Sequence, residues 1–479
     1  MVIAFERRAM PLDTDFEIDV TWRNSHAYTA DLTTYHQLLD RAEEQSGEEL
    51  PDEDPDKRYL IIDSYCQIED YDRITEIAAV TRPNILVMLG IISFVTGKAL
   101  TPFGFYHSIQ NVAKALPEGD PPAAKLWLDE VDYSVPLAEM LQAMAALPEA
   151  KQTLMYSLLD RWRKSTFLDE ESEDSYLYED EAILACFHIL ELLGKEYSAV
   201  LDQEIKEKVE IFTTDVLNLF YIGGPEETSK LHKLVDSTLE QHKVKVKPRI
   251  LRMLQELGLL EPKSRALVDR FLDHRNAIAH GRVNLYEDKA IFPLKPFFTH
   301  MKNIYEDIET IRIVCARVIA AYLGVSLWSA EWKEVIAQEV APYEQVQQFN
   351  RQRQYAQLTW QQYEQGGPSG ISVYTLLHYY RLGKLALPSF ALSLGGYIQQ
   401  VELSEDNSML VLYIASILAD SVDEATAGKA RELLQTLHKS EYQARHEFRD
   451  VLKELTYQGR PPQWLKQFLI EKANANRPK

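Results

Sequence analysis

The stretch DHRNAIAHGR, from Asp273 to Arg282, places an arginine, an asparagine and a histidine within six residues. Apolar residues before it recur every three or four positions, so it lies at the end of a predicted helix that stops at Gly281. Such a stretch is a solvated helix end, a metal site or a catalytic motif. His274 and His280 lie about 240° apart around a helix and cannot share one ion, so we predict no metal here.

A helix over residues 264–280 has an apolar face and a polar face. Five apolar residues fall on one side of it: Leu267, Val268, Phe271, Leu272 and Ile278. Four polar residues spaced by four, three and four positions form a separate stripe: Asp269, Asp273, Asn276 and His280. This pattern predicts that the apolar side enters the core while His280 lies on the polar side, in the last turn.

The composition indicates a globular protein of several domains. The chain has 479 residues, 46% of them hydrophobic and 10% aromatic, which is too long for one core. Its three cysteines are far apart and form no CxxC pair, which favours a reducing compartment. The most apolar run, residues 85–95, is about half as long as a bilayer requires. We expect a cytoplasmic protein with no membrane segment.

The charge is unevenly distributed along the chain. The net charge is −22, which by itself argues against nucleic acid as a partner. Between Lys230 and Lys295, however, 14 Lys and Arg stand against 8 Asp and Glu, a local balance of +6 that leaves −28 for the rest. The motif therefore lies in a basic island, and the acidic runs at 43–56 and 169–181 are interpreted as solvated loops.

Short local patterns predict a mixed N-terminal region followed by helices. Residues 15–22 and 57–65 have the β-branched and aromatic content of strands, and residues 84–96 read as a buried helix beginning near Pro83. The run KLWLDEV, 125–131, shows the three- and four-residue spacing of a helix. Residues 342–365 read as one amphipathic helix that ends at a glycine-rich turn.

We therefore predict a mainly α protein with four parts. Residues 1–118 form a mixed α+β N-terminal domain, and residues 119–178 form a helical connector with an acidic linker. Residues 179–325 form a helical bundle that contains the motif, and residues 326–479 form a helical C-terminal domain.

The motif resembles that of a known family. Arg275 followed by Asn276, with His280 five positions after the arginine and Gly281 next, is similar to the Arg-x-x-x-x-His motif of the HEPN superfamily. The setting resembles that family too, because the motif comes late in a predicted helical bundle and a long helix follows it. The resemblance covers residues 179–325 and implies a HEPN-like bundle there.

The resemblance also implies a function. Many HEPN domains are endoribonucleases that need no metal or other cofactor, act as homodimers and belong to toxin–antitoxin or antiviral defence systems. Carried over, Arg275, Asn276 and His280 are the expected catalytic residues, and RNA is the expected substrate. From the basic island we expect five residues to contact that RNA: Lys243, Lys245, Lys247, Arg249 and Arg282. A regulatory protein or antitoxin is a further expected partner.

One position departs from the family's pattern, and two other functions stay open. HEPN toxins that are silenced by AMP transfer carry a tyrosine two residues after the histidine, where this chain has Arg282. The chain therefore lacks the tyrosine at which those toxins are regulated by AMP transfer. A HEPN-fold module that binds RNA or protein without cutting is the main alternative. A purely structural helical scaffold is a third, although it leaves the basic island unexplained.

Overall fold

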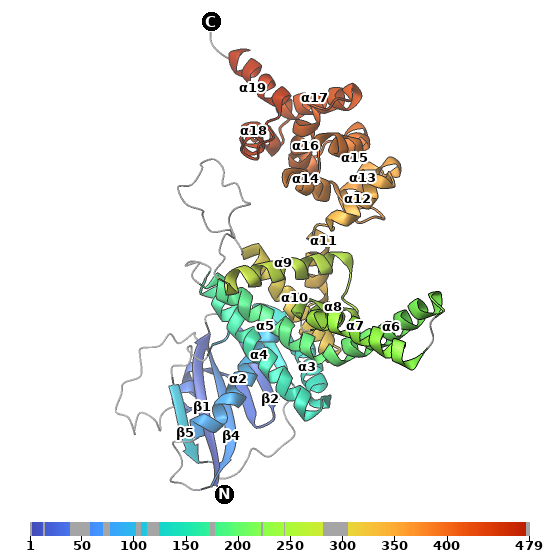
Figure 1. Ribbon diagram of the computed structural model, residues 1–479. Helices are drawn as coiled ribbons and strands as arrows, with labels where there is room; N and C mark the ends of the chain where they lie inside the picture. Colours follow the sequence, from blue (N-terminus) through green and yellow to red (C-terminus); the bar gives the residue numbers. More distant parts are fainter. Residues whose placement is uncertain are drawn as a thin grey trace. The chain divides into compact units, whose positions relative to one another are not determined.

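The computed structural model describes residues 2–12, 15–38, 58–69, 77–101, 107–112, 124–172, 178–221, 224–243, 245–280 and 305–475 (Figure 1). These residues form a mainly helical protein with an antiparallel sheet near the N-terminus, as the sequence predicts. The chain divides into two compact units. Met1–Leu260 and Ile304–Val335 form unit 1, and Glu261–Asn303 and Ile336–Lys479 form unit 2. The four predicted parts and their boundaries stay predictions.

Unit 1 begins with a seven-stranded antiparallel sheet of order β5-β1-β4-β3-β2-β6-β7. Its strands are β1 (Val2–Leu12), β2 (Phe16–Trp22), β3 (Ser25–Asp31), β4 (Arg58–Ile68), β5 (His107–Val112), β6 (Lys125–Leu128) and β7 (Val131–Asp132). The strands predicted at 15–22 and 57–65 are confirmed as β2 and β4. The helical prediction for KLWLDEV is wrong, because Asp129 and Glu130 adopt positive φ and turn β6 into β7.

In unit 1 one helix lies between β4 and β5, and the others follow the last strand. These helices are α2 (Ile77–Thr96), α3 (Ser134–Ala146), α4 (Glu149–Glu170), α5 (Glu179–Glu196), α6 (Ser198–Leu219), α7 (Pro225–Lys243), α8 (Val246–Glu256) and α10 (Tyr305–Leu323), while α11 (Ser329–Gln338) crosses into unit 2. Pro148 separates α3 from α4, because its ring cannot continue a helix.

The helix α2 packs on the sheet and on α4, and it supplies buried side chains to the core of unit 1. Within the described residues it is the one helix long and apolar enough to cross a membrane, yet 56% of its most apolar window is buried inside the protein. The helix begins earlier than predicted, so that Pro83 lies inside it. Pro83 is exposed, and water can therefore reach the carbonyl group that its missing N–H leaves unpaired.

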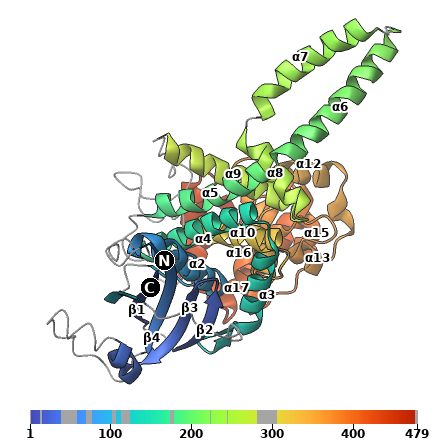
Figure 2. The same cartoon turned by 90° about the horizontal axis from the view of Figure 1, so that it is seen from below.

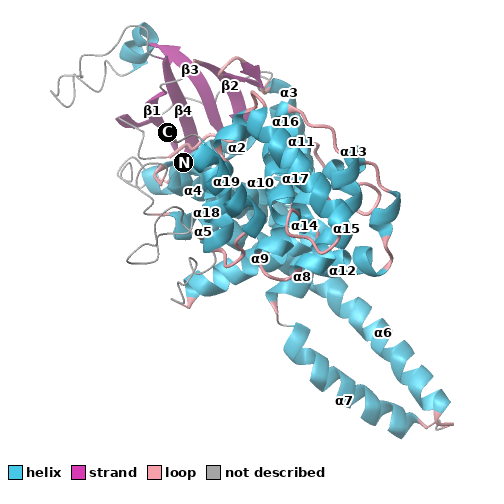
Figure 3. Cartoon of the chain, turned by 90° about the horizontal axis from the view of Figure 1, so that it is seen from above, coloured by secondary structure: helices cyan, strands magenta, loops and turns pink. Residues whose placement is uncertain are grey.

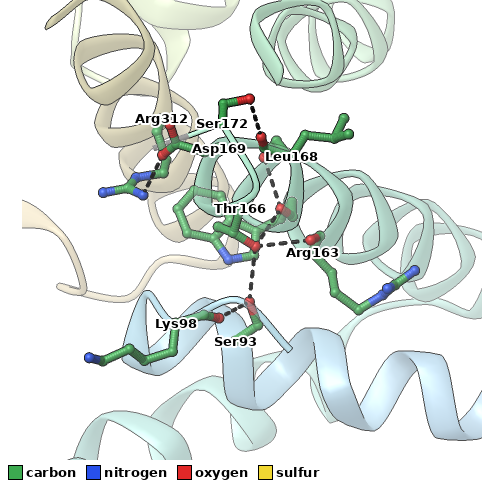
Figure 4. A network of polar contacts seen from close by, with 10 residues as sticks. Ser93, Lys98, Arg163, Thr166, Leu168, Asp169, Ser172 and Arg312 are labelled. Carbon is green, nitrogen blue, oxygen red and sulfur yellow. Dashed lines mark hydrogen bonds and ion pairs between the residues drawn. The ribbon is translucent and has the colours of Figure 1, made fainter. Parts of the chain in front are cut away.

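Two kinds of contact fix α2 against its neighbouring helices. At Gly90 the helix approaches α4 so closely that an added Cβ would lie 3.0 Å from the Cβ atom of Leu159. Figure 4 shows a polar network beside this crossing, in which the Ser93 hydroxyl donates to the Lys98 carbonyl at 2.6 Å and contacts the Thr166 hydroxyl. In the same network Arg312 of α10 donates to Asp169 of α4 at 2.8 Å.

The helices α6 and α7 run side by side as a hairpin that extends from the other helices of unit 1 (Figures 2 and 3). Only two side chains of α6 are buried, Val209 and Thr213. Several large apolar side chains of the hairpin are exposed instead: Ile211, Phe212, Leu219, Phe220, Tyr221 and Leu234. The hairpin therefore adds little to the core of unit 1.

Unit 2 is helical. It contains α9 (Pro262–Ala279), α12 (Tyr343–Arg351), α13 (Trp360–Gln365), α14 (Val373–Arg381), α15 (Leu387–Gln400), α16 (Glu405–Leu418), α17 (Glu424–Lys439), α18 (Phe448–Tyr457) and α19 (Gln463–Ala475), with 3-10 helices at Gln354–Gln357 and Gln443–His446. The single helix predicted over 342–365 is wrong. Arg353 has a φ of 50° and ends α12, and the Thr359 hydroxyl accepts a hydrogen bond from the N–H of Gln362 to start α13.

The close crossing at Gly90 makes a stability prediction. Gly90→Val places a branched side chain against Leu159, and such overpacking costs about 1–3 kcal/mol. We expect a lower urea midpoint for this variant. Gly428→Val is the matched control, because Gly428 also lies inside a helix but has no atom within 4 Å of the added Cβ. Equal midpoints for the two variants would contradict the packing described for α2 and α4.

Candidate functional site

The motif lies at the C-terminal end of α9, whose start is fixed by local chemistry. Pro262 occupies the first turn, where its missing N–H costs nothing. The backbone N–H of Glu261 donates to the Ser264 hydroxyl at 2.8 Å. The Lys263 ammonium donates to the carbonyl groups of Ile336 and Ala337 at the end of α11, at 3.0 and 3.2 Å. These bonds fix the first turn of α9.

The middle of α9 is fixed by burial and by one ion pair. Leu267, Val268 and Phe271 are each 1% exposed, as the sequence predicts. Arg270 donates to Glu339 at 2.9 Å across unit 2. The prediction that Leu272 and Ile278 complete the buried face is wrong in part, because both are only half-buried and His274, 4% exposed, is buried in their place.

Two of the three expected catalytic residues are in direct contact. The Arg275 guanidinium donates to the Asn276 side-chain oxygen at 3.2 Å, and Asn276 is exposed. The helix ends at Ala279, so His280 is its C-cap and not part of the last turn. The backbone N–H of His280 donates to the Asn276 carbonyl at 3.2 Å, and the His280 side chain is exposed. The structure thus places an arginine, an amide and an imidazole on the exposed end of one helix.

This arrangement brings together two kinds of chemical group. One can transfer protons near neutral pH, and the other can bind anions. An exposed imidazole accepts and donates protons, and a planar guanidinium binds phosphate oxygens through a fork of N–H groups. The Asn276 side-chain oxygen accepts from the Arg275 guanidinium, and the Asn276 backbone carbonyl accepts from the backbone N–H of His280.

The expected RNA-contacting residues are only partly brought together. Lys245 is the N-cap of α8 and is exposed, and Lys247 and Arg249 follow in the first turn of that helix, half-buried. Lys243 is the last residue of α7. Arg282 lies outside the described residues, as does the glycine predicted to end α9. The residues on α7 and α8 belong to unit 1, whereas the expected catalytic residues belong to unit 2.

Unit 2 contains a basic cluster that sequence reasoning missed. His378 and Arg381 lie three residues apart on α14, Lys384 follows, and Arg270 of α9 is close enough to act on the same imidazole. His378 is exposed at the surface, but neighbouring side chains remove part of the hydration of its ring, and the charges of Arg381, Lys384 and Arg270 add to this effect, so the pKa of His378 is lowered. The sequence pattern that could have predicted this cluster is the run HYYRLGK, 378–384, because two of its basic residues share one helical face.

Known proteins give no guide to this site. The chain matches no family model, no curated protein and no solved structure. Within the described residues, no group of three or more His, Cys, Asp and Glu side chains is arranged to hold a metal ion.

The lowered pKa of His378 makes a pH prediction. Because the folded-state pKa lies below the unfolded value of about 6.5, protonation favours the unfolded chain. The stability of unit 2 should therefore fall as the pH drops below about 6.5, and His378→Gln should remove part of that fall. Histidine NMR titration provides a direct measurement: Lys384→Ala should raise the pKa of His378, and Lys439→Ala, outside the cluster, should leave it unchanged. A pKa that does not respond to Lys384→Ala would contradict the cluster.

Proposed function

We propose that this chain is a metal-independent endoribonuclease of the HEPN type that acts in a toxin or antiviral defence system. The observation that carries the proposal is the exposed end of α9, where Arg275 is hydrogen-bonded to Asn276 and His280 lies one turn further on. The defence role rests on the resemblance of the motif to HEPN proteins.

The proposed reaction uses the nucleophile that RNA already carries. The 2′-hydroxyl attacks the neighbouring phosphate, so the protein has to move protons and stabilise the negative charge of the pentacoordinate phosphorane. His280 transfers a proton, and Arg275 binds the non-bridging phosphate oxygens. Asn276 orients the Arg275 guanidinium through the hydrogen bond at 3.2 Å. The 5′-oxygen leaves with a proton, and a 2′,3′-cyclic phosphate forms.

The proposed RNA path uses the basic residues outside the motif. Lys243, Lys245, Lys247 and Arg249 are proposed to bind phosphates, together with Arg282. The large negative charge on the rest of the chain disfavours RNA elsewhere on its surface. We propose a cytoplasmic protein whose acidic segments and a regulatory protein or antitoxin control access to this path.

We propose a homodimer that uses the end of α9. Arg275 and His280 are about 140° apart around the helix, so a single copy surrounds a phosphate poorly. Two copies about a two-fold axis supply two histidines, for the base and acid roles, and two arginines for one phosphate. Asp273, Asn276 and His280 are exposed in the single chain and so are accessible to a second copy.

Cleavage of RNA tests the proposed activity. The purified full chain should cut total RNA or tRNA in EDTA, and His280→Ala should reduce the rate by about 10²–10⁴, as expected for loss of a general acid–base group. His446→Ala is the matched control, because His446 is another exposed histidine of unit 2. RNA that binds but is never cut would favour the non-catalytic alternative. Loss of cleavage in EDTA would contradict the metal-independent mechanism.

Mixing two inactive variants tests the shared cleft. An Arg275→Ala chain and a His280→Ala chain, each inactive alone, should recover part of the activity when they are co-expressed or refolded together. The recovery follows because a heterodimer retains one intact arginine and one intact histidine in the same cleft. Light scattering should report a dimer for the wild-type chain. A fully active monomer would exclude the two-copy arrangement.

A further inference from the structure

Unit 1 has a cavity that is rich in positive charge, unlike most of the chain. Its volume is about 390 Å³, and α4, α5 and α8 supply its walls. Four of its lining residues are basic or imidazole groups: Arg161, His188, Lys195 and Arg249. Cavities of roughly 300–1,000 Å³ hold small ligands and cofactors, so this one has the size of a small-molecule site.

The positive charges of the cavity are poorly compensated. Within the described part of the chain, neither Lys195 nor Arg249 makes an ion pair, and Glu191 is the one carboxylate among the lining residues. The Nε atom of Arg161 is buried without a hydrogen-bond partner in the structure, and its Nη1 reaches only the Ser157 carbonyl, at 3.5 Å. Unpaired cations held close together repel one another, and a bound anion relieves that repulsion.

The start of α8 adds to the positive potential. Lys245 is its N-cap but makes no side-chain capping bond, and Val246 at the first helical position lines the cavity. The N–H groups of a helix's first turn have no partner within the helix, and the helix dipole is positive at that end. An anion in this cavity therefore meets the positive end of the α8 dipole as well as the basic side chains.

Part of the cavity lining is apolar and is held in place by close helix packing. It consists of Leu192 of α5 and Val246 and Ile250 of α8. At Gly194, α5 approaches α8 so closely that an added Cβ would lie 3.3 Å from the backbone nitrogen of Ile250. The absence of a side chain at Gly194 thus allows the two helices to hold their lining residues in fixed positions.

We propose that this cavity binds a phosphate-bearing ligand of mononucleotide size. Arg161, Arg249 and the N-terminus of α8 receive the phosphate, with Lys195 at the exposed rim. The apolar lining residues contact the nucleobase of the ligand, and Glu191 accepts a hydrogen bond from one of its amino or hydroxyl groups. The cavity shares Arg249 with the proposed RNA path, but the α9 motif lies in unit 2, and nucleotide binding is measured without RNA cleavage, so this proposal can fail or hold independently of the ribonuclease activity.

Calorimetric titration of the full chain tests the site with defined probes. AMP and GMP should bind at least 10-fold more tightly than adenosine and guanosine, because the phosphate meets the unpaired cations. Arg249→Gln and Arg161→Gln should each weaken AMP binding at least 10-fold. Lys206→Gln is the matched control, since Lys206 is an exposed lysine of α6 outside the cavity, and it should leave the affinity unchanged.

The same experiment distinguishes the phosphate of an RNA end from the phosphate of a free nucleotide. Two short oligonucleotides are compared as competitors of AMP, one with a 5′-phosphate and one with a 5′-hydroxyl group. If only the phosphorylated one competes, the cavity binds RNA ends. Competition by neither oligonucleotide assigns it to free nucleotides. The proposal is overturned if no phosphate-bearing probe binds at millimolar concentration, or if folded Arg249→Gln protein binds AMP as tightly as the wild-type chain does.

Discussion

The position of the candidate catalytic residues depends on one constraint, which is the burial of a single side of α9. Leu267, Val268 and Phe271 are almost fully buried, and each such side chain contributes about 1.5–3 kcal/mol through removal from water. Rotating the helix to bury Asn276 and His280 would expose all three and would bury polar groups at further cost. The same burial that fixes the orientation of the helix therefore holds the candidate catalytic residues at the protein surface.

The sequence predicts those parts of the fold that are governed by local patterns. The alternation in β2, the apolar run of β4 and the periodicity of α9 are each visible within about ten residues. Other features depend on contacts outside the local segment. The first four residues of KLWLDEV form the strand β6 because they pair with β2. The helix α12 ends at Arg351, and the positive φ of Arg353 prevents it from continuing, although the apolar spacing goes on beyond it. His274 is buried although its residue type predicts a polar position.

The candidate site likewise has features that local sequence patterns predict and features that depend on contacts between distant segments. Arg275, Asn276 and His280 lie within one short segment, so their proximity follows from helix geometry alone. The hydrogen bond between Arg275 and Asn276 adds a contact that spacing does not specify. The cavity of unit 1 joins residues of three helices that are distant in sequence, and only packing such as that at Gly194 brings them together. No local pattern could have revealed it.

The most direct test of the central claim is the chemistry of the RNA ends. The 2′-hydroxyl is the nucleophile in the proposed mechanism, so each cut should leave a 2′,3′-cyclic phosphate and a 5′-hydroxyl end. A single 2′-deoxy nucleotide on the 5′ side of a mapped cleavage site should block cutting at that site alone. Products with 5′-phosphate ends, or unchanged cutting at the 2′-deoxy position, would contradict the role proposed for Arg275, Asn276 and His280.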